Sequence, residues 1–163
     1  MILNYQSQKQ ILDNWCWAAV GSSISFYYNL NNQGRYQSEI AAGLLGSVCS
    51  NINADNADSS PVQCNAVLDI SRALQFTRNY AGEFPFAFGF NDIVQQINAG
   101  FPICCQISWV NSGNAHFVTI YGYESNHLII ADPQAGIFSV PYAQFLNYRG
   151  GVWRRTIGTQ RSS

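Results

Sequence analysis

Apolar residues in the first part of the chain follow helical patterns. Residues 14–28, NWCWAAVGSSISFYY, form an apolar run rich in small residues that is too long for a typical strand. This pattern predicts a mostly buried helix, with Asp13 or Asn14 as its N-terminal cap. Cys16 then falls in the first turn, where unpaired backbone N–H groups and the positive end of the helix dipole stabilise a thiolate.

Three shorter helices are expected downstream, at residues 37–46, 64–76 and 91–99. The first has Ser38 as its expected cap. The second carries Val67, Ile70 and Leu74 at helical spacing, so these three side chains are predicted to share one face. The third is expected to end before Gly100, because glycine is common just past the end of a helix.

Beyond Gly100 the pattern changes to short apolar segments separated by turn residues, which predicts strands at residues 101–109, 115–124 and 127–132. Helices first and strands afterwards indicate an α+β fold, with an N-terminal helical part packed on a C-terminal antiparallel β-sheet. No internal repeat or Pro/Gly linker divides the chain, so residues 1–163 are expected to form a single domain.

The composition fits a packed domain and argues against some classes of partner. Hydrophobic residues make up 47% of the chain and charged residues 10%, as in globular proteins. The formal net charge of -1 leaves no basic excess to neutralise phosphates, so nucleic acid is not an expected partner. No apolar run approaches the roughly 18 residues that a membrane-spanning helix needs, and MILNYQSQKQ lacks a signal-peptide pattern. We therefore expect a soluble monomer without a membrane partner.

Five cysteines cannot all pair within a monomer, so at least one thiol stays free. Cys49 and Cys64 flank the polar stretch SNINADNADSSPVQ. They could close this loop as a disulfide in an oxidising compartment, or remain two thiols of a surface loop. Cys104 and Cys105 lie in the apolar run ICCQISW and are expected to be small buried hydrophobes that point to opposite faces of a sheet.

Candidates for nucleophilic chemistry are few. Attack on a carbonyl through sulfur requires a thiolate, an imidazole that shares its proton and a third group that fixes the tautomer of the imidazole. The chain has only two histidines. His127 follows a turn and is expected to be a solvated loop residue, whereas His116 opens the apolar strand HFVTIYGY. His116 is therefore the candidate base, with a structural histidine as the alternative.

Two segments resemble known peptidases. QILDNWCWAA, in which Gln10 precedes Cys16 by six positions, resembles the nucleophile region of papain-like cysteine peptidases. HFVTIYGYESNHLIIADPQAG is similar to the His-strand, turn, strand and Asp-Pro-x-x-Gly arrangement of two compact bacterial groups, the C39-like and the AvrRpt2-like (C70) peptidases. The AvrRpt2-like group is the closer match, because its members carry an N-x-C-W-A-A helix start and a Cys-rich, Asn/Ser-rich loop, here residues 14–19 and 49–65.

The resemblance implies a papain-like fold and a role for each of four residues. Cys16 would be the nucleophile and His116 the general base. Asp132 would orient the imidazole of His116. Gln10 would donate its side-chain amide to the oxyanion, alongside the backbone N–H of Cys16.

Several alternatives to these assignments remain. Asp69 and Asp92 are the other candidate carboxylates, although each lies on a predicted helix and would more naturally cap it or face solvent. Gln6 and Gln8 are alternative donors to Gln10. Among the tryptophans, Trp15 and Trp17 flank the nucleophile, and core packing is expected for at least Trp17. The remaining candidate near the site is Trp109, which could shield the His-Asp pair from water.

The implied activity is hydrolysis of peptide bonds of protein substrates through a Cys-His-Asp triad and an acyl-enzyme. No C-x-x-C or H-x-x-x-H spacing occurs, so no metal and no cofactor is expected. By analogy alone, the chain resembles an effector or toxin domain from a longer polypeptide, secreted or delivered into a target cell, with an immunity or inhibitor protein as a possible partner. Deamidation, transglutamination and peptidoglycan amide cleavage are alternatives on the same fold, as is partner binding without turnover.

Overall fold

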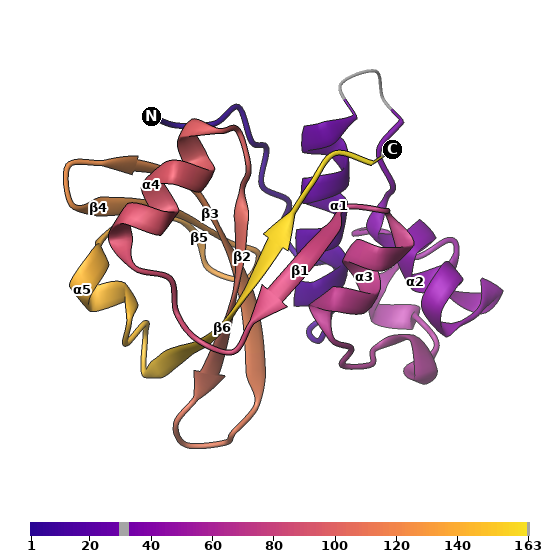
Figure 1. The fold of residues 1–163 in the computed structure, drawn as a ribbon. Coiled ribbons are helices and arrows are strands. Elements are labelled where there is room, and N and C mark those ends of the chain that lie inside the picture. The colour runs from indigo at the N-terminus through magenta and orange to yellow at the C-terminus, as the bar shows by residue number, and fades with distance from the viewer. Residues whose placement is uncertain (30–32, 163) are drawn as a thin grey trace.

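Three α-helices precede all six strands along the chain in the computed structural model, which describes residues 1–29 and 33–162 (Figure 1). Three helices of the N-terminal part pack together, namely α1 (Cys16–Tyr28), α2 (Gln37–Leu45) and α3 (Ile70–Phe76). The polar loop between α2 and α3 contains the short 3-10 helices η1 (Ser47–Cys49), η2 (Ala57–Ser59) and η3 (Val62–Cys64). The fold is α+β, as the sequence pattern predicts.

The C-terminal part forms a six-stranded antiparallel sheet with the strand order β1-β6-β2-β3-β4-β5. The strands are β1 (Tyr80–Phe84), β2 (Ile103–Trp109), β3 (Ala115–Glu124), β4 (His127–Asp132), β5 (Gly136–Pro141) and β6 (Gly151–Thr159). The predictions for β3 and β4 are confirmed to the residue, while β2 begins at Ile103 instead of residue 101.

A hydrophobic core lies on each face of this sheet. Helix α1 covers one face, and the helices α4 (Phe90–Asn98) and α5 (Tyr142–Phe145) cover the other (Figure 1). Cys104 belongs to the first core and Cys105 to the second, and both are 0% exposed. Alternation along β2 thus sends the two neighbouring side chains to opposite faces, which confirms the prediction for this pair.

The start of α1 differs from the predicted one. The helix begins at Cys16 and its N-cap residue is Trp15, without a side-chain hydrogen bond to the cap. Neither Asp13 nor Asn14 caps the helix, so this prediction is wrong. Asn14 is engaged elsewhere, because its backbone N–H and side-chain amide donate to the side chain and backbone carbonyl of Asn65, at 3.0 and 2.9 Å.

Of the predictions for the ends of α2 and α4, the first is wrong and the second is confirmed. The N-cap of α2 is Tyr36 instead of Ser38, and the carboxylate of Glu39 accepts the Tyr36 N–H at 3.0 Å. Helix α4 ends at Asn98, and Gly100 follows in the left-handed region at φ 92°. The expectation of a glycine just past this helix is therefore confirmed.

Helix α3 begins six residues later than predicted, at Ile70. The carboxylate of Asp69 accepts the backbone N–H of Ser71 at 3.2 Å, so Asp69 is the cap that fixes this start. Ile70 and Leu74 are fully buried, whereas Val67 is 67% exposed. The prediction that Val67 shares their face is wrong, because Val67 precedes the helix.

A disulfide between Cys49 and Cys64 closes the polar loop, which decides between the two alternatives left open by the sequence. Backbone carbonyls at the end of this bridge and just after it accept hydrogen bonds from the segment around Cys16. The indole N–H of Trp15 donates to the carbonyl of Cys64 at 2.6 Å, and that of Trp17 donates to the carbonyl of Ala66 at 2.9 Å. The backbone carbonyls of Cys64 and Ala66 therefore accept these indole N–H groups, and neither residue is part of α3.

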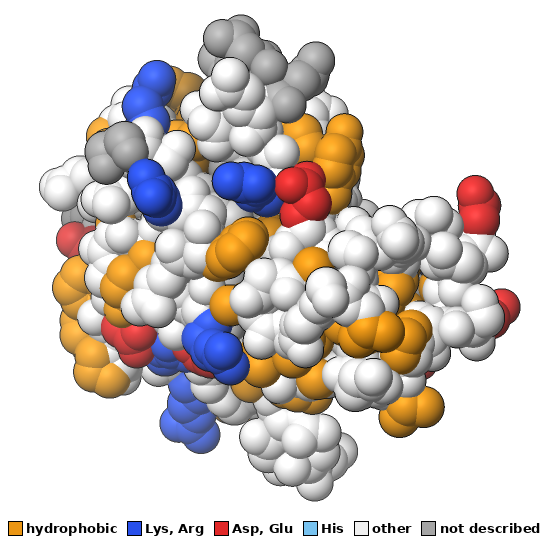
Figure 2. All heavy atoms as spheres, turned by 90° about the vertical axis from the view of Figure 1, so that its right-hand side faces the viewer, with side chains coloured by type: hydrophobic (Ala, Val, Ile, Leu, Met, Phe, Trp, Pro, Cys, Tyr) orange, Lys and Arg blue, Asp and Glu red, His pale blue; other side chains and the backbone are white. Residues whose placement is uncertain are grey.

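Charged side chains are few on the face of the molecule that carries α2 and α3. Figure 2 shows that basic and acidic side chains are scattered there among uncharged ones, without a large patch of either sign. Among the residues that the structure describes, no helix has the length and apolar character needed to cross a membrane.

Candidate active site

Cys16 is held at the start of α1 by contacts on both sides. It is the first residue of the helix and is 8% exposed. Its backbone N–H has no carbonyl four residues earlier within the helix and is therefore free to bind a ligand atom. The neighbours Trp15 and Trp17 are both 0% exposed and anchored to the loop after the disulfide. Core packing is confirmed for Trp17 and holds for Trp15 as well.

His116 and Asp132 meet because β3 and β4 are antiparallel. His116 is the second residue of β3 and Asp132 is the last residue of β4, so the two lie at the same end of the strand pair. The ring Nε2 of His116 lies 2.8 Å from Oδ1 of Asp132. The two residues are 5% and 3% exposed, so this pair is largely removed from water.

The surroundings of His116 favour its charged form. Burial lowers the pKa of the imidazole, but hydrogen bonds with Asp132 and Cys16 outweigh burial, and the pKa rises to about 9. For Asp132, burial raises the pKa, but the interaction with His116 and the other donors outweighs it, and the pKa falls to about 2. Because Nε2 faces Asp132, Nδ1 is the ring nitrogen left for Cys16. The three side chains are thus suited to an ion pair with an orienting carboxylate.

Trp109 lies over the imidazole of His116. The two rings are stacked, with centroids 5.5 Å apart and an interplanar angle of 20°. Trp109 is the last residue of β2, and its neighbouring strand β3 carries His116. The indole therefore covers one face of the ring and limits the access of water to it, as the sequence analysis suggested for this residue.

The side chain of Gln10 points into its own loop. Its amide nitrogen donates to the backbone carbonyls of Leu12 and Asp13, at 3.2 and 2.6 Å. Its oxygen Oε1 is buried without a hydrogen-bond partner among the described residues. In this conformation no N–H of Gln10 is directed at the sulfur of Cys16, so the oxyanion role remains a prediction that requires the amide to turn.

The alternatives to Gln10 are also engaged elsewhere. The side-chain oxygen of Gln8 accepts a hydrogen bond from Gln37 at 3.1 Å. The amide nitrogen of Gln6 donates to the exposed side chain of Asn4 at 3.3 Å. Neither contact directs the side chain toward Cys16.

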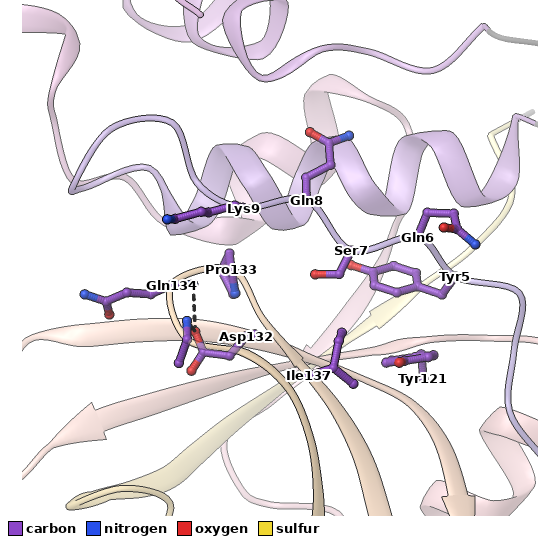
Figure 3. Close-up of a pocket in the computed structure, with 12 residues that line it drawn as sticks. Tyr5, Gln6, Ser7, Gln8, Lys9, Tyr121, Asp132, Pro133, Gln134 and Ile137 are labelled. Carbon is purple, nitrogen blue, oxygen red and sulfur yellow. Dashed lines mark hydrogen bonds between the residues drawn. The ribbon is translucent and has the colours of Figure 1, made fainter. Parts of the chain in front are cut away.

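The turn after Asp132 is fixed by the carboxylate itself. Oδ1 accepts the backbone N–H groups of Gln134 and Ala135, at 2.9 and 3.1 Å. The N–H of Gln10 donates to the carbonyl of Pro133 at 2.9 Å, so this turn contacts the segment that leads to the nucleophile. A groove of about 540 Å³ lies between this turn and residues 5–9. Its lining residues are drawn in Figure 3.

A second hollow of about 500 Å³ lies on another side of the same turn. It is lined by Trp109, Arg149 and the turn residues Asp132, Gln134 and Ala135. The Asp132 turn thus borders two hollows, and Asp132 itself lines both of them.

Tyr148 also belongs to this group of residues, although no sequence pattern points to it. Its hydroxyl donates to Oδ2 of Asp132 at 2.8 Å, and the residue is 3% exposed. No motif marks this position, because the contact joins the end of β4 to the loop before β6. Only the folded chain brings the two groups together.

The remaining candidates lie away from the His-Asp pair. Asp69 caps α3 and forms an ion pair with Arg155. Asp92 lies in the first turn of α4, on the far face of the sheet from α1. His127 contacts the side chain of the neighbouring Asn126 at 3.0 Å. The helix cap expected of Asp69 is confirmed. His127, by contrast, is the first residue of β4, so the expectation of a loop residue is wrong.

Solved structures with the same fold are peptidases. The peptidase domain of Streptococcus ComA aligns over 96% of this chain and 100% of its own length, with a TM-score of 0.59 and 16% identity. A C39-like peptidase from Bacillus anthracis aligns over 99% and 98%, with a TM-score of 0.58 and 15% identity. A double glycine motif protease from an AMS/PCAT transporter, in complex with its leader peptide, aligns over 97% and 93%, with a TM-score of 0.53 and 18% identity.

Sequence comparison identifies the family. No curated protein matches the chain. The model of the family described as papain-like cysteine protease AvrRpt2 matches residues 1–147, which is most of the chain. The match includes the start of α1 with Cys16, the start of β3 with His116 and the end of β4 with Asp132. The chain therefore belongs to the AvrRpt2 family of papain-like cysteine proteases and is a cysteine peptidase.

Proposed function

We propose that the chain hydrolyses peptide bonds of protein substrates, with Cys16 as nucleophile, His116 as general base and acid, and Asp132 as the orienting carboxylate. The 2.8 Å contact between Nε2 of His116 and Oδ1 of Asp132 carries this proposal. It fixes the tautomer and the direction of the imidazole, so that Nδ1 is presented to the thiol at the start of α1.

In the acylation step, Nδ1 of His116 takes the proton of Cys16, and the thiolate attacks the carbonyl carbon of the scissile peptide bond. The carbonyl oxygen becomes an oxyanion that the backbone N–H of Cys16 stabilises. The C–N bond breaks while the imidazolium returns its proton to the leaving nitrogen. The products of this step are a free amine and an acyl-enzyme thioester on Cys16.

Water completes the reaction. His116 removes a proton from a water molecule, whose oxygen attacks the thioester carbonyl. The C–S bond breaks, and Cys16 regains a proton from the imidazolium as the carboxylic acid product leaves. Asp132 remains ionised throughout and stabilises the imidazolium that forms twice in the cycle.

Gln10 is proposed as the second donor to the oxyanion. Its Nε2 would have to exchange the carbonyl of Leu12 or Asp13 for the substrate oxygen. The longer of these two contacts, at 3.2 Å to Leu12, is the one whose loss would cost less. The buried Oε1 without a partner supports a side chain that is not in its final arrangement.

The proposed substrate is an extended segment of a protein, and the hollows beside the Asp132 turn support this choice. The structurally similar transporter protease was solved with a leader peptide bound, which is in line with a peptide ligand for this fold.

We further propose that the chain acts as an effector or toxin domain, secreted or delivered into a target cell, where an inhibitor protein could regulate it.

Alkylation of cysteine tests the ion pair without knowledge of the substrate. The chain is treated with one equivalent of iodoacetamide between pH 5 and 9, and the modified residue is mapped. We expect Cys16 to react faster than Cys104 and Cys105 below pH 7, and His116→Ala to remove this advantage. His127→Ala is the matched control and leaves the rate unchanged. If Cys16 is indifferent to His116, the triad is wrong.

Substrate panels then identify the reaction. A protein mixture, glutamine peptides and peptidoglycan fragments are each incubated with the wild type and with Cys16→Ala. New peptide termini that depend on Cys16 support proteolysis. Release of ammonia without new termini indicates deamidation, and cleavage of the peptidoglycan fragments alone indicates an amidase.

A further inference from the structure

The two oxygens of the Asp132 carboxylate are used differently. Oδ1 accepts three N–H donors, from His116 at 2.8 Å and from the backbone of Gln134 and Ala135 at 2.9 and 3.1 Å. Among the described residues, Oδ2 accepts a single hydrogen bond, from the hydroxyl of Tyr148 at 2.8 Å. Because Asp132 is only 3% exposed, water has little access to replace that donor.

Tyr148 is held in position by packing and by its backbone. Its ring contacts the ring of Phe145, with centroids 5.3 Å apart, and Phe145 in turn contacts Trp153 at 5.1 Å. The carbonyl of Tyr148 accepts the N–H of Gly151 at 2.8 Å. The phenol is therefore placed by the core of the far sheet face, so that removal of the hydroxyl alone leaves the ring with its packing partners.

The hydroxyl of Tyr148 adds a contact that helps to fix the direction of the carboxylate. A carboxyl group can rotate about its bond to Cβ, and rotation would move Oδ1 away from the imidazole of His116. The hydrogen bond from Tyr148 to Oδ2 opposes this rotation from the side that the turn residues do not reach. The same bond favours the ionised form of Asp132, since a donor to a carboxylate stabilises its charge.

We infer that Tyr148 is a positioning residue of the active site, which holds the Asp132 carboxylate ionised and directed at His116. This inference rests on the proposed triad. Tyr148 lies just beyond residues 1–147, which the family model matches, and its hydroxyl reaches back to Asp132 within the matched part. The segment that carries Tyr148 thus contributes to catalysis through Asp132 without touching the substrate.

The test is Tyr148→Phe, which removes the hydroxyl and keeps the ring. We expect kcat on a cleaved peptide to fall about tenfold, with KM changed less than twofold, since the lost bond is made to a charged group. The acidic limb of the kcat/KM profile moves to higher pH, because Asp132 loses a donor that lowers its pKa and is protonated sooner. If Tyr148 only stabilised the fold, the acidic limb of the kcat/KM profile would stay at the same pH.

Tyr142→Phe is the matched control. Its hydroxyl donates to the carbonyl of Phe88 at 2.8 Å, away from the triad, so the control loses one hydrogen bond of the same kind. We expect its kcat and pH profile to equal those of the wild type. Thermal unfolding of both variants reports any loss of stability, and equal kcat and pH profiles in Tyr148→Phe and wild type would overturn the inference.

A double-mutant cycle separates this inference from the proposed triad. If Tyr148 acts through Asp132, Tyr148→Phe does not slow the Asp132→Ala variant any further. An equal additional slowing in that background means that Tyr148 acts independently, which contradicts the inference. The rate of Cys16 alkylation is measured for every variant, so a chain without peptide turnover still yields the comparison. A failed triad appears separately, as alkylation that does not depend on His116.

Discussion

At the residue scale, the charge of Asp132 governs the proton that His116 carries. Burial lowers the pKa of His116, and the interactions with Asp132 and Cys16 raise it to about 9. Asp132→Asn removes the negative charge while it keeps the size of the side chain. The pKa of His116 is then expected to fall, because burial is less fully offset.

The expected result for Asp132→Asn is a shift of the basic limb of the kcat/KM profile to lower pH, together with a roughly 10- to 100-fold loss of kcat/KM, equivalent to about 1.5–3 kcal/mol. The measurement is kcat/KM between pH 5 and 10. In the wild type we expect the basic limb near pH 9, because the pKa of His116 is raised to about 9 and the imidazolium loses its proton there. If the basic limb of Asp132→Asn lies at the same pH as that of the wild type, a group other than His116 determines the limb.

The sequence predicted the individual residues of the site unevenly. Counting two histidines and reading a family motif led to His116 and Cys16, and the structure brings both to the start of a secondary-structure element. The role of Tyr148 could not be predicted, because no sequence motif marks this tyrosine and only the folded chain brings its hydroxyl to Asp132. The orientation of Gln10 depends on two loop carbonyls that no spacing reveals.

At the scale of elements, the polar loop that ends in η3 supports the nucleophile. The disulfide closes a loop with a sequence separation of 15 residues, and the carbonyls of Cys64 and Ala66 accept hydrogen bonds from the two tryptophans that flank Cys16. A variant that combines Cys49→Ala and Cys64→Ala is expected to lose about 3 kcal/mol of unfolding free energy, because a loop of about this length is no longer closed in the unfolded chain.

Urea denaturation measures this loss, and iodoacetamide reports the effect on the nucleophile. We expect slower alkylation of Cys16 in the same variant, since Cys64 and Ala66 would hold the flanking indoles less firmly. Cys104→Ala is the control, because it removes a buried sulfur without removing a cross-link. Unchanged alkylation in the double variant would mean that the loop holds its position without the bridge.

Elements with a strong periodic pattern could be predicted, and those defined by distant partners could not. β3 and β4 are buried nearly throughout, so their apolar runs mark them clearly. β1 and β5 form the two outer edges of the sheet and contain no fully buried residue, and Gly82 interrupts β1 at φ 102°. Their sequences therefore resemble loops. β6 carries two arginines in its middle, which interrupt its apolar alternation.

At the scale of the whole molecule, Arg155 ties the helical part to the sheet. From β6, its guanidinium binds Asp69 at the start of α3 at 2.7 and 2.9 Å, and Glu83 of β1 at 2.8 and 3.0 Å. It also donates to Gln106 of β2 at 2.9 Å. The hydrogen bonds with Arg155 outweigh burial and lower the pKa of Asp69 to about 2.

Arg155→Lys is expected to lower the unfolding free energy by about 1–2 kcal/mol at pH 7, because an ammonium cannot reproduce the forked contacts. Arg154→Lys, on the neighbouring exposed residue, is the control and is expected to be neutral. Since the folded-state pKa of Asp69 is lowered, its contribution is present above pH 4 and is lost as pH falls through about 2. Urea denaturation at several pH values should therefore show the difference between wild type and Arg155→Lys shrinking over that range.

The strand order was the part of the architecture that the sequence could not supply. Helices before strands indicated the fold class, because segregated elements pack as separate layers. The insertion of β6 between β1 and β2 depends on pairings between residues far apart, such as Cys104 with Ile157. Nothing in the local pattern of either strand specifies such a partner.

The thiol of Cys16 and the disulfide between Cys49 and Cys64 differ in how easily a reductant reaches them. Thiol–disulfide exchange begins when a thiolate attacks a sulfur of the bridge, so its rate depends on access. The cysteines of the bridge are 0% exposed, whereas Cys16 is 8% exposed. A mild reductant is therefore expected to reduce oxidised Cys16 faster than it opens the bridge between Cys49 and Cys64. Burial of both bridge sulfurs is therefore expected to let the cross-link persist under reducing conditions that keep Cys16 as a free thiol.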